Sequence, residues 1–90
     1  PIYLNQTIKV LKEKGYWIVG AENTDKSILY TELKYDFPVA LVIGSEGKGI
    51  SQLVAKNCDY LIKIPMKGKI NSLNASVSAG ILIYEIIRNR

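Results

Sequence analysis

The chain has 90 residues, and its hydrophobic content of 48% suits one small domain with its own core and excludes a disordered segment. It contains no histidine and a single cysteine, which excludes His-based catalytic triads, histidine zinc sites and an internal disulfide. The formal net charge of +4 is compatible with a polyanionic partner such as RNA, although many domains without such a partner are equally basic.

The location of the protein can be predicted from what the chain lacks. No apolar run approaches the roughly 20 residues of a membrane-spanning helix, and the first residues do not resemble a signal peptide. With the lone Cys58, this predicts a reducing compartment, the cytoplasm. The chain begins at Pro1 rather than at methionine, which suggests a piece of a longer polypeptide.

The first predicted elements are a helix and a strand. Asn5 is expected to cap the helix and Gly15 to end it. Aromatic and β-branched residues from Tyr16 to Ala21 then predict a strand. Residues 27–33 are compatible with a short helix or a strand, and the sequence does not decide between them.

The most informative stretch of the chain is VALVIGSEGKGIS. Its unbroken apolar segment, residues 39–43, predicts a central parallel strand that is buried on both faces. Gly44, Gly47 and Gly49 predict a turn in which a ligand can approach the backbone closely. Ser51 is expected to cap a short helix that follows the turn.

A second loop of similar character follows the predicted strand Tyr60 to Ile64. Pro65 stops the strand, and the final helix is expected to run from Ser72 or Asn74 to Arg88. Strands separated by helices indicate an α/β fold with a mostly parallel sheet and helices on both faces. Because ligands bind at the carboxyl ends of such strands, we expect the two loops to lie at neighbouring strand ends and form one site.

The polar and charged residues of these loops allow two interpretations each. Glu46 is either a solvated turn residue or a hydrogen-bond acceptor for loop amides and substrate. Ser72 and Asn74 are either helix caps or a polar pair facing the glycine loop. The three lysines of the second loop region are either a solvated edge or phosphate contacts: Lys63, Lys67 and Lys69.

Two nucleotide-binding motifs are disfavoured by spacing. A P-loop requires lysine directly after the glycine that closes its four-residue gap, whereas Gly49 is followed by Ile50. The Rossmann fingerprint G-x-G-x-x-G has its glycines spaced the other way around. On spacing alone, the glycines describe an ordinary tight turn between a strand and a helix.

Taken together, the two loops resemble motifs two and three of the SpoU family, which are ribose 2′-O-methyltransferases of transfer or ribosomal RNA. The resemblance is carried by ALVIGSEGKGIS, residues 40–51, and IPMKGKINSLNASVSAGILIYE, residues 64–85, and less sharply by the upstream strand YWIVGAE. Ala75 and Ser78 depart from the usual valine and alanine. The resemblance implies a SPOUT-type α/β trefoil knot, truncated here on its amino-terminal side, and S-adenosylmethionine as cofactor.

The resemblance also implies roles for individual residues. Gly44, Ile64 and Leu73 would contact the cofactor, and Met66 and Gly68 would line the same pocket. The catalytic positions are matched by a second set of residues: Glu46 would hold polar groups of the loop and substrate, while Ser72 and Asn74 would order the pocket and orient the ribose hydroxyl or its flanking phosphate.

The reaction that the resemblance implies needs no metal, because the cofactor supplies the electrophile, but it does need a base. The family assigns that task to an asparagine and an arginine in motif one, and no segment before Pro38 matches that motif. We therefore expect residues 1–90 to be the C-terminal part of the catalytic domain, inactive alone, with RNA as substrate and a homodimer formed near the last helix. The rival readings are a non-catalytic RNA-binding or assembly module of the same fold and a generic nucleotide-binding α/β domain.

Overall fold

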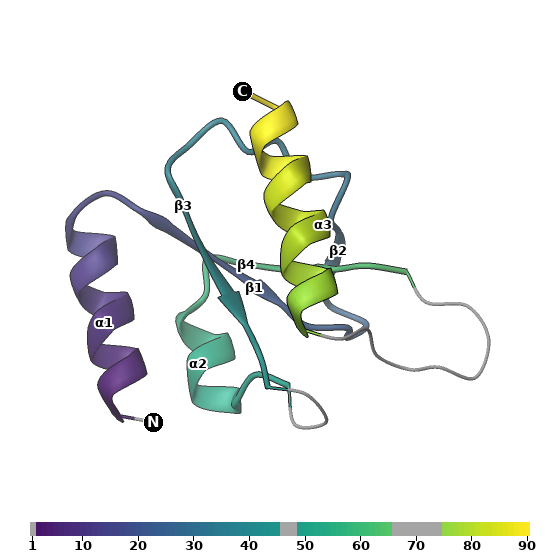
Figure 1. Ribbon diagram of the computed structural model, residues 1–90. Helices are drawn as coiled ribbons and strands as arrows, with labels where there is room; N and C mark the ends of the chain where they lie inside the picture. Colours follow the sequence, from purple (N-terminus) through teal and green to yellow (C-terminus); the bar gives the residue numbers. More distant parts are fainter. Residues whose placement is uncertain (1, 46–48, 66–74) are drawn as a thin grey trace.

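The computed structural model describes residues 2–45, 49–65 and 75–90 of the chain. Figure 1 shows a four-stranded sheet with helices packed against it. The strands are all parallel and lie in the order β2-β4-β1-β3, so that β1 is internal and β3 forms one edge. The elements in chain order are α1 (Ile2–Glu13), β1 (Trp17–Ala21), β2 (Ile28–Leu29), β3 (Val39–Ile43), α2 (Gln52–Asn57), β4 (Tyr60–Lys63) and α3 (Ala75–Arg88).

Helices cover both faces of the sheet, as the sequence predicts. Successive side chains of a strand point to opposite faces, and in β1 the fully buried Ile18 and Val19 do so. Ile18 packs with Ile8 of α1 and Val54 of α2, whereas Val19 packs in a cluster that includes Leu82 of α3. Figure 1 accordingly shows α1 and α2 on one side of the sheet and α3 on the other.

Local sequence signals explain most of the helix ends. Gly15 has a φ of 94°, which favours glycine, and it follows the end of α1 as expected. The Ser51 side chain accepts a hydrogen bond from the Val54 amide at 3.3 Å and caps α2. The prediction for Asn5 is wrong, since α1 already begins at Ile2. The Asn5 side chain instead accepts a hydrogen bond from Asn57 Nδ2 at 2.6 Å, which ties α1 to the end of α2.

The prediction of a buried central strand at residues 39–43 is also wrong in part. The strand has the predicted bounds, but β3 pairs only with β1, and all five of its residues are half-buried. An edge strand has one neighbour instead of two, so less of its surface is covered. The two candidate loops therefore follow strands that are not direct neighbours, because β1 lies between β3 and β4.

Only part of the apolar surface of α3 packs against the sheet. Leu82 and Glu85 are buried, whereas Val77, Tyr84 and Ile87 are 51%, 70% and 63% exposed. Glu85 is accommodated because Arg88 and Asn89 donate hydrogen bonds to its carboxylate. A strongly apolar face of α3 thus points away from the domain.

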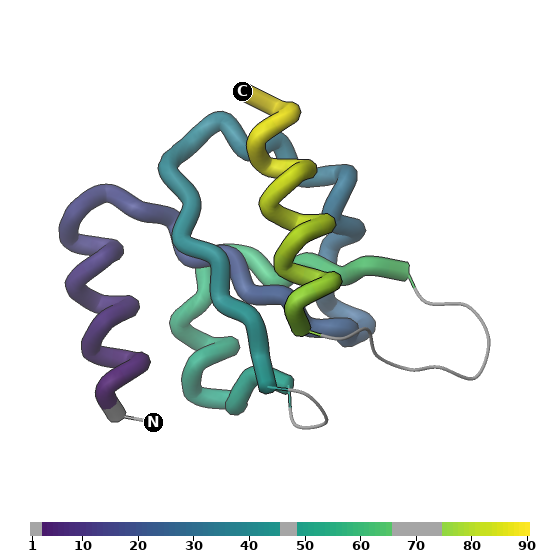
Figure 2. The backbone as a smooth tube through the Cα atoms, in the orientation of Figure 1, coloured from purple at the N-terminus to yellow at the C-terminus, as the bar shows by residue number. Residues whose placement is uncertain are grey.

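Figure 2 shows that the two ends of the chain lie far apart, the start of α1 and the end of α3 being at opposite ends of the molecule. The segment 66–74, which joins β4 to α3, lies outside the described residues, so the trefoil knot stays a prediction. Within the described ranges, no helix is long and apolar enough to cross a membrane.

Candidate functional site

The sequence predicts a site at the carboxyl ends of the strands, and three adjacent strands end there. In the sheet register, Ile43 of β3 lies opposite Ala21 of β1, and Ala21 lies opposite Ile62 of β4. Neighbouring strands are about 4.8 Å apart, so Ile43 and Ile62 are separated by about 10 Å. Gly44 and Ile64 follow these strands and therefore lie at the same end of the sheet, on either side of the end of β1.

Gly44 begins a turn in which backbone packs directly on backbone. A Cβ atom added to Gly44 would lie 2.2 Å from the carbonyl carbon of Gly49, a distance that no side chain tolerates. Gly49 has a φ of 67°, and its amide donates a hydrogen bond to the Ser45 carbonyl at 2.9 Å. Both glycines are therefore required by the geometry of the turn, rather than being merely permitted by it.

Glu22, directly after β1, contacts this turn. The sequence did not indicate a role for it. Its Oε2 accepts a hydrogen bond from the Ile50 amide at 2.9 Å. A Cβ atom on Gly49 would lie 2.8 Å from Oε1 of the same carboxylate. The signal in the sequence is an acidic residue directly after a strand, but its partner is 28 positions away and only the sheet order brings the two together.

Ile64 lies beyond β4 and is half-buried. Ile64 and Ile43 both pack against the cluster formed by Val19, Tyr35, Ile62 and Leu82, which is the core on the α3 side of the sheet. The ends of β3 and β4 therefore share an apolar surface on that side. An aromatic ring of a ligand could rest on such a surface, while the glycine turn offers main-chain polar groups nearby.

The structure brings Gly44 and Ile64, two of the predicted cofactor-binding residues, to one edge of the sheet. Lys63 ends β4 and is half-buried. The remaining candidates lie outside the described residues: Glu46, Met66, Gly68, Ser72, Leu73 and Asn74, together with Lys67 and Lys69.

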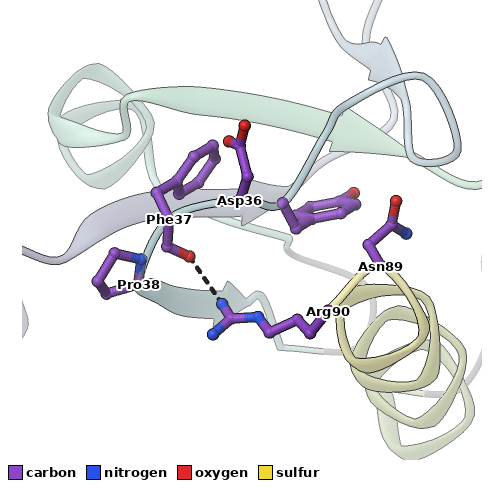
Figure 3. Close-up of a pocket in the computed structure, with 6 residues that line it drawn as sticks. Asp36, Phe37, Pro38, Asn89 and Arg90 are labelled. Carbon is purple, nitrogen blue, oxygen red and sulfur yellow. Dashed lines mark hydrogen bonds between the residues drawn. The ribbon is translucent and has the colours of Figure 1, made fainter.

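A pocket of about 330 Å³ lies at the other end of β3. Figure 3 shows Arg90 donating a hydrogen bond to the Phe37 carbonyl, at 2.7 Å, while the carboxylate of Asp36 points away from the guanidinium. The pocket is lined by Tyr35, Asp36, Phe37, Pro38, Asn89 and Arg90. Residues 35–38 precede β3, whereas Gly44 follows it, so the pocket lies at the opposite end of β3 from the predicted site.

The titratable groups with shifted pKa values among the described residues do not include a base at the glycine turn. Burial, with smaller effects of Glu85 and Tyr30, raises the pKa of Tyr35 to about 12. Hydrogen bonding from Arg88 lowers the pKa of Glu85 despite its burial. Burial raises the pKa of the Cys58 thiol, which donates a hydrogen bond to the Val54 carbonyl of α2. Among the described residues of the turn, Gly44 and Gly49 offer main-chain groups to a cofactor.

Comparison with known sequences gives a consistent family. A model of the SpoU rRNA Methylase family matches residues 3–84. A protein of Staphylococcus haemolyticus, named for the TrmH family of tRNA/rRNA methyltransferases, is 54% identical over 87 residues. That match covers 97% of this chain but 34% of the relative, so the chain spans about a third of the relative's length.

Solved structures of similar fold belong to the same group. The TrmH/SpoU tRNA modifying enzyme of A. aeolicus superimposes with a TM-score of 0.87 at 38% identity, over 94% of this chain and 43% of that one. An RNA 2′-O ribose methyltransferase gives a TM-score of 0.84 at 31% identity, over 96% of this chain and 33% of that one. The SpoU methyltransferase AviRb of Streptomyces viridochromogenes, solved in complex with AdoMet, gives a TM-score of 0.83 at 29% identity, over 100% of this chain and 36% of that one.

The family match spans most of the chain, and the parallel sheet that carries the glycine turn is the fold of these enzymes. The chain belongs to the SpoU rRNA Methylase family.

Proposed function

We propose that this chain is the C-terminal part of an S-adenosylmethionine-dependent methyltransferase that modifies a ribose 2′-hydroxyl of ribosomal or transfer RNA. The observation that carries the proposal is the turn at the carboxyl end of β3, where Gly44 packs on the Gly49 backbone. Further support comes from the similar 2′-O ribose methyltransferase and from AviRb, which was solved with AdoMet. The proposed place of action is the cytoplasm.

The described residues fit an adenosyl cofactor in two respects. Gly44 and Gly49 present main chain without side chains, so a ligand can approach their amide and carbonyl groups directly. Ile43 and Ile64 supply an apolar surface about 10 Å wide across the end of β1. In the proposed site, Leu73, Met66 and Gly68 complete the pocket.

The proposed reaction joins the ribose 2′ oxygen to a methyl carbon while the bond from that carbon to sulfur breaks. The bonding pair stays on sulfur, which becomes a neutral thioether, and the hydroxyl proton passes to a base. S-adenosylmethionine supplies the methyl group as an electrophile, so that the protein has to align the oxygen and remove the proton. In this proposal Glu46 holds polar groups of loop and substrate, and Ser72 with Asn74 orients the ribose.

The proposal predicts that these 90 residues bind the cofactor weakly and do not turn over alone, because the motif-one asparagine and arginine lie upstream. The test compares the 90-residue chain with the complete natural polypeptide, using radiolabelled S-adenosylmethionine and bulk ribosomal and transfer RNA. A 2′-O-methyl group blocks alkaline cleavage of the adjacent linkage, so the label should be recovered in alkali-resistant dinucleotides.

Gly44→Val in the complete polypeptide is expected to abolish incorporation, since the added side chain collides with Gly49. Label recovered in alkali-sensitive nucleotides would contradict the ribose target. RNA binding without any incorporation by the complete polypeptide would favour a non-catalytic RNA-binding or assembly module. Methyl transfer by the 90 residues alone would contradict their proposed dependence on an upstream motif.

The proposed assembly is a homodimer that buries the outer face of α3. Val77, Ile83, Tyr84 and Ile87 lie on this face, and each is between 48% and 70% exposed. An exposed apolar stripe of this kind on one helix is typical of a surface that another subunit covers. The proposed path from β4 into α3 is the trefoil knot that the resemblance implies, and it is supported by the likeness in fold to the solved SpoU enzymes.

A further inference from the structure

Two hydrogen bonds hold the backbone directly after the internal strand β1. The Glu22 amide donates a hydrogen bond to the Ile62 carbonyl of β4 at 2.9 Å, and the Glu22 carbonyl accepts one from the Ser27 hydroxyl. Ser27 is itself buried and also bonds to the Thr24 hydroxyl. The backbone of Glu22 is therefore fixed by Ile62 of β4 and by Ser27, and its side chain projects from a fixed position.

From this position the Glu22 side chain crosses to the glycine turn that follows β3. Its Oε2 accepts a hydrogen bond from the Ile50 amide at 2.9 Å, and a Cβ atom on Gly49 would lie 2.8 Å from Oε1 and 3.0 Å from Oε2 of this carboxylate. Gly49 in turn packs on Gly44 and bonds to the Ser45 carbonyl. A chain of direct contacts thus leads from the end of β1, through one carboxylate, to the glycine proposed to bind the cofactor.

The turn has few other restraints of this kind among the described residues. The Ser45 to Gly49 bridge closes the turn on itself, and Ser51 caps the start of α2. The hydrogen bond from the Ile50 amide to Glu22 fixes the backbone at the exit of the turn to the end of β1, while the Ile50 side chain packs against the cluster that includes Ile18 of β1. Without it, the Ile50 amide would lose a charged acceptor in a half-buried position, and the backbone of the turn would be less restrained relative to β1.

We propose that Glu22 is a positioning residue, which holds the glycine turn in the conformation that binds S-adenosylmethionine. This inference rests on the function proposed above. Glu22 touches the turn and not the reacting atoms, so it acts on cofactor affinity through Gly49 and Gly44. What matters is the reach of the side chain and an oxygen acceptor at its end, rather than its negative charge.

The test measures the Kd for S-adenosylhomocysteine by calorimetry in the complete polypeptide. Glu22→Gln keeps the length and an amide oxygen, and it should bind within about threefold of the native protein. Glu22→Asp keeps the charge but is one methylene too short to reach Ile50. It should bind roughly tenfold or more weakly, the effect expected when a half-buried amide is left without an acceptor. Glu32→Asp, at an exposed acid in the turn after β2, is the matched control and should have native affinity.

Two further readouts separate positioning from general stability. All variants should bind RNA like the native protein in the absence of cofactor, and Glu22→Asp should move the amide signals of Gly49 and Ile50 in NMR spectra more than Glu22→Gln does. Affinity in Glu22→Asp equal to or better than in Glu22→Gln would overturn the role of Glu22 and leave the proposed function intact. Failure of the native polypeptide to bind the cofactor product at all would overturn both.

Discussion

Single glycines and one carboxylate decide the geometry at the carboxyl edge of the sheet. Gly44 and Gly49 occupy positions where a Cβ atom would meet backbone or carboxylate at less than 3 Å. The turn is therefore built from main chain, and it is held against β1 by Glu22. Substitution of these residues should affect both the fold of the turn and the affinity for the cofactor.

Gly44→Ala is expected to lower the free energy of unfolding by about 1–3 kcal/mol, the usual cost of overpacking. Its methyl group has no space, because the Gly49 carbonyl carbon would be 2.2 Å away. Gly80→Ala is the matched control, since nothing lies within 4 Å of the added Cβ atom in α3. This control should raise the free energy of unfolding by about 0.5–1 kcal/mol through helix propensity. Urea denaturation of the two variants measures both effects, and equal effects would contradict the account of the turn.

Tyr35 makes the stability of the domain depend on alkaline pH. Its hydroxyl is buried and donates to the Tyr30 carbonyl at 2.6 Å, and its pKa is raised to about 12. A raised pKa means that the folded state holds this proton more tightly than the unfolded state does. The contribution is therefore complete below the unfolded pKa of 10.0 and is lost as the pH rises through about 12.

Tyr35→Phe should lower the free energy of unfolding by about 1–2 kcal/mol near neutral pH, because the Tyr30 carbonyl loses its donor. The difference between native protein and variant should shrink when urea denaturation is repeated at about pH 11. Comparison with the variant removes the effect of other titrating groups. A difference that is the same at both pH values would show that the Tyr35 proton is not linked to folding.

At the scale of elements, the sequence predicts most of the structure that local signals determine. The bounds of β3, the cap of α2 at Ser51 and the stop at Gly15 are confirmed, because apolar runs, hydroxyl caps and glycine φ preferences act within a few residues. The order of the strands is set by tertiary pairing. The edge position of β3 and the placement of β1 between the two loops could not be read from periodicity.

The candidate site shows the same division. Gly44 was predicted from a strand that ends in glycines, and the structure supplies the reason in its contact with Gly49. Glu22 was missed because its partner, Ile50, is distant in sequence and close only through the pairing of β1 with β3. The burial of Glu85 in α3 could not be predicted from the sequence, because it depends on hydrogen bonds that Arg88 and Asn89 donate to its carboxylate.

The outer face of α3 should decide the oligomeric state. Tyr84→Glu places a charge on this apolar stripe, where 70% of the tyrosine is exposed, so it should leave the folded subunit intact and shift a dimer towards monomer. Leu53→Glu is the matched control, since Leu53 of α2 is also an exposed apolar residue, at 60%. Sedimentation of both variants in the complete polypeptide measures the shift. Equal dimerisation by both variants would place the subunit interface elsewhere.

At the scale of the whole molecule, the sheet has two ends of different character. The end at which the strands finish carries the glycine turn, Glu22 and Ile64. The other end carries the pocket beside Phe37 and Arg90, together with stacked rings of Trp17, Phe37 and Tyr60. A strand of five residues separates the two ends by about 17 Å. A ligand bound at one end therefore cannot contact the other directly unless it is long.

The chain is much shorter than its relatives, and this limits what it is expected to do alone. It covers about a third of the length of its TrmH relative, and the proposed cofactor loops lie within it. We therefore expect the carboxyl ends of the strands to hold the cofactor in the complete polypeptide.

The most direct test of this claim is an NMR titration of the labelled complete polypeptide with S-adenosylhomocysteine. The account predicts that the largest amide shifts occur at Gly44, Gly49, Ile50 and Ile64, and that Phe37 and Arg90 are unaffected. Shifts centred on Phe37 and Arg90, or no shifts at a saturating concentration, would contradict it.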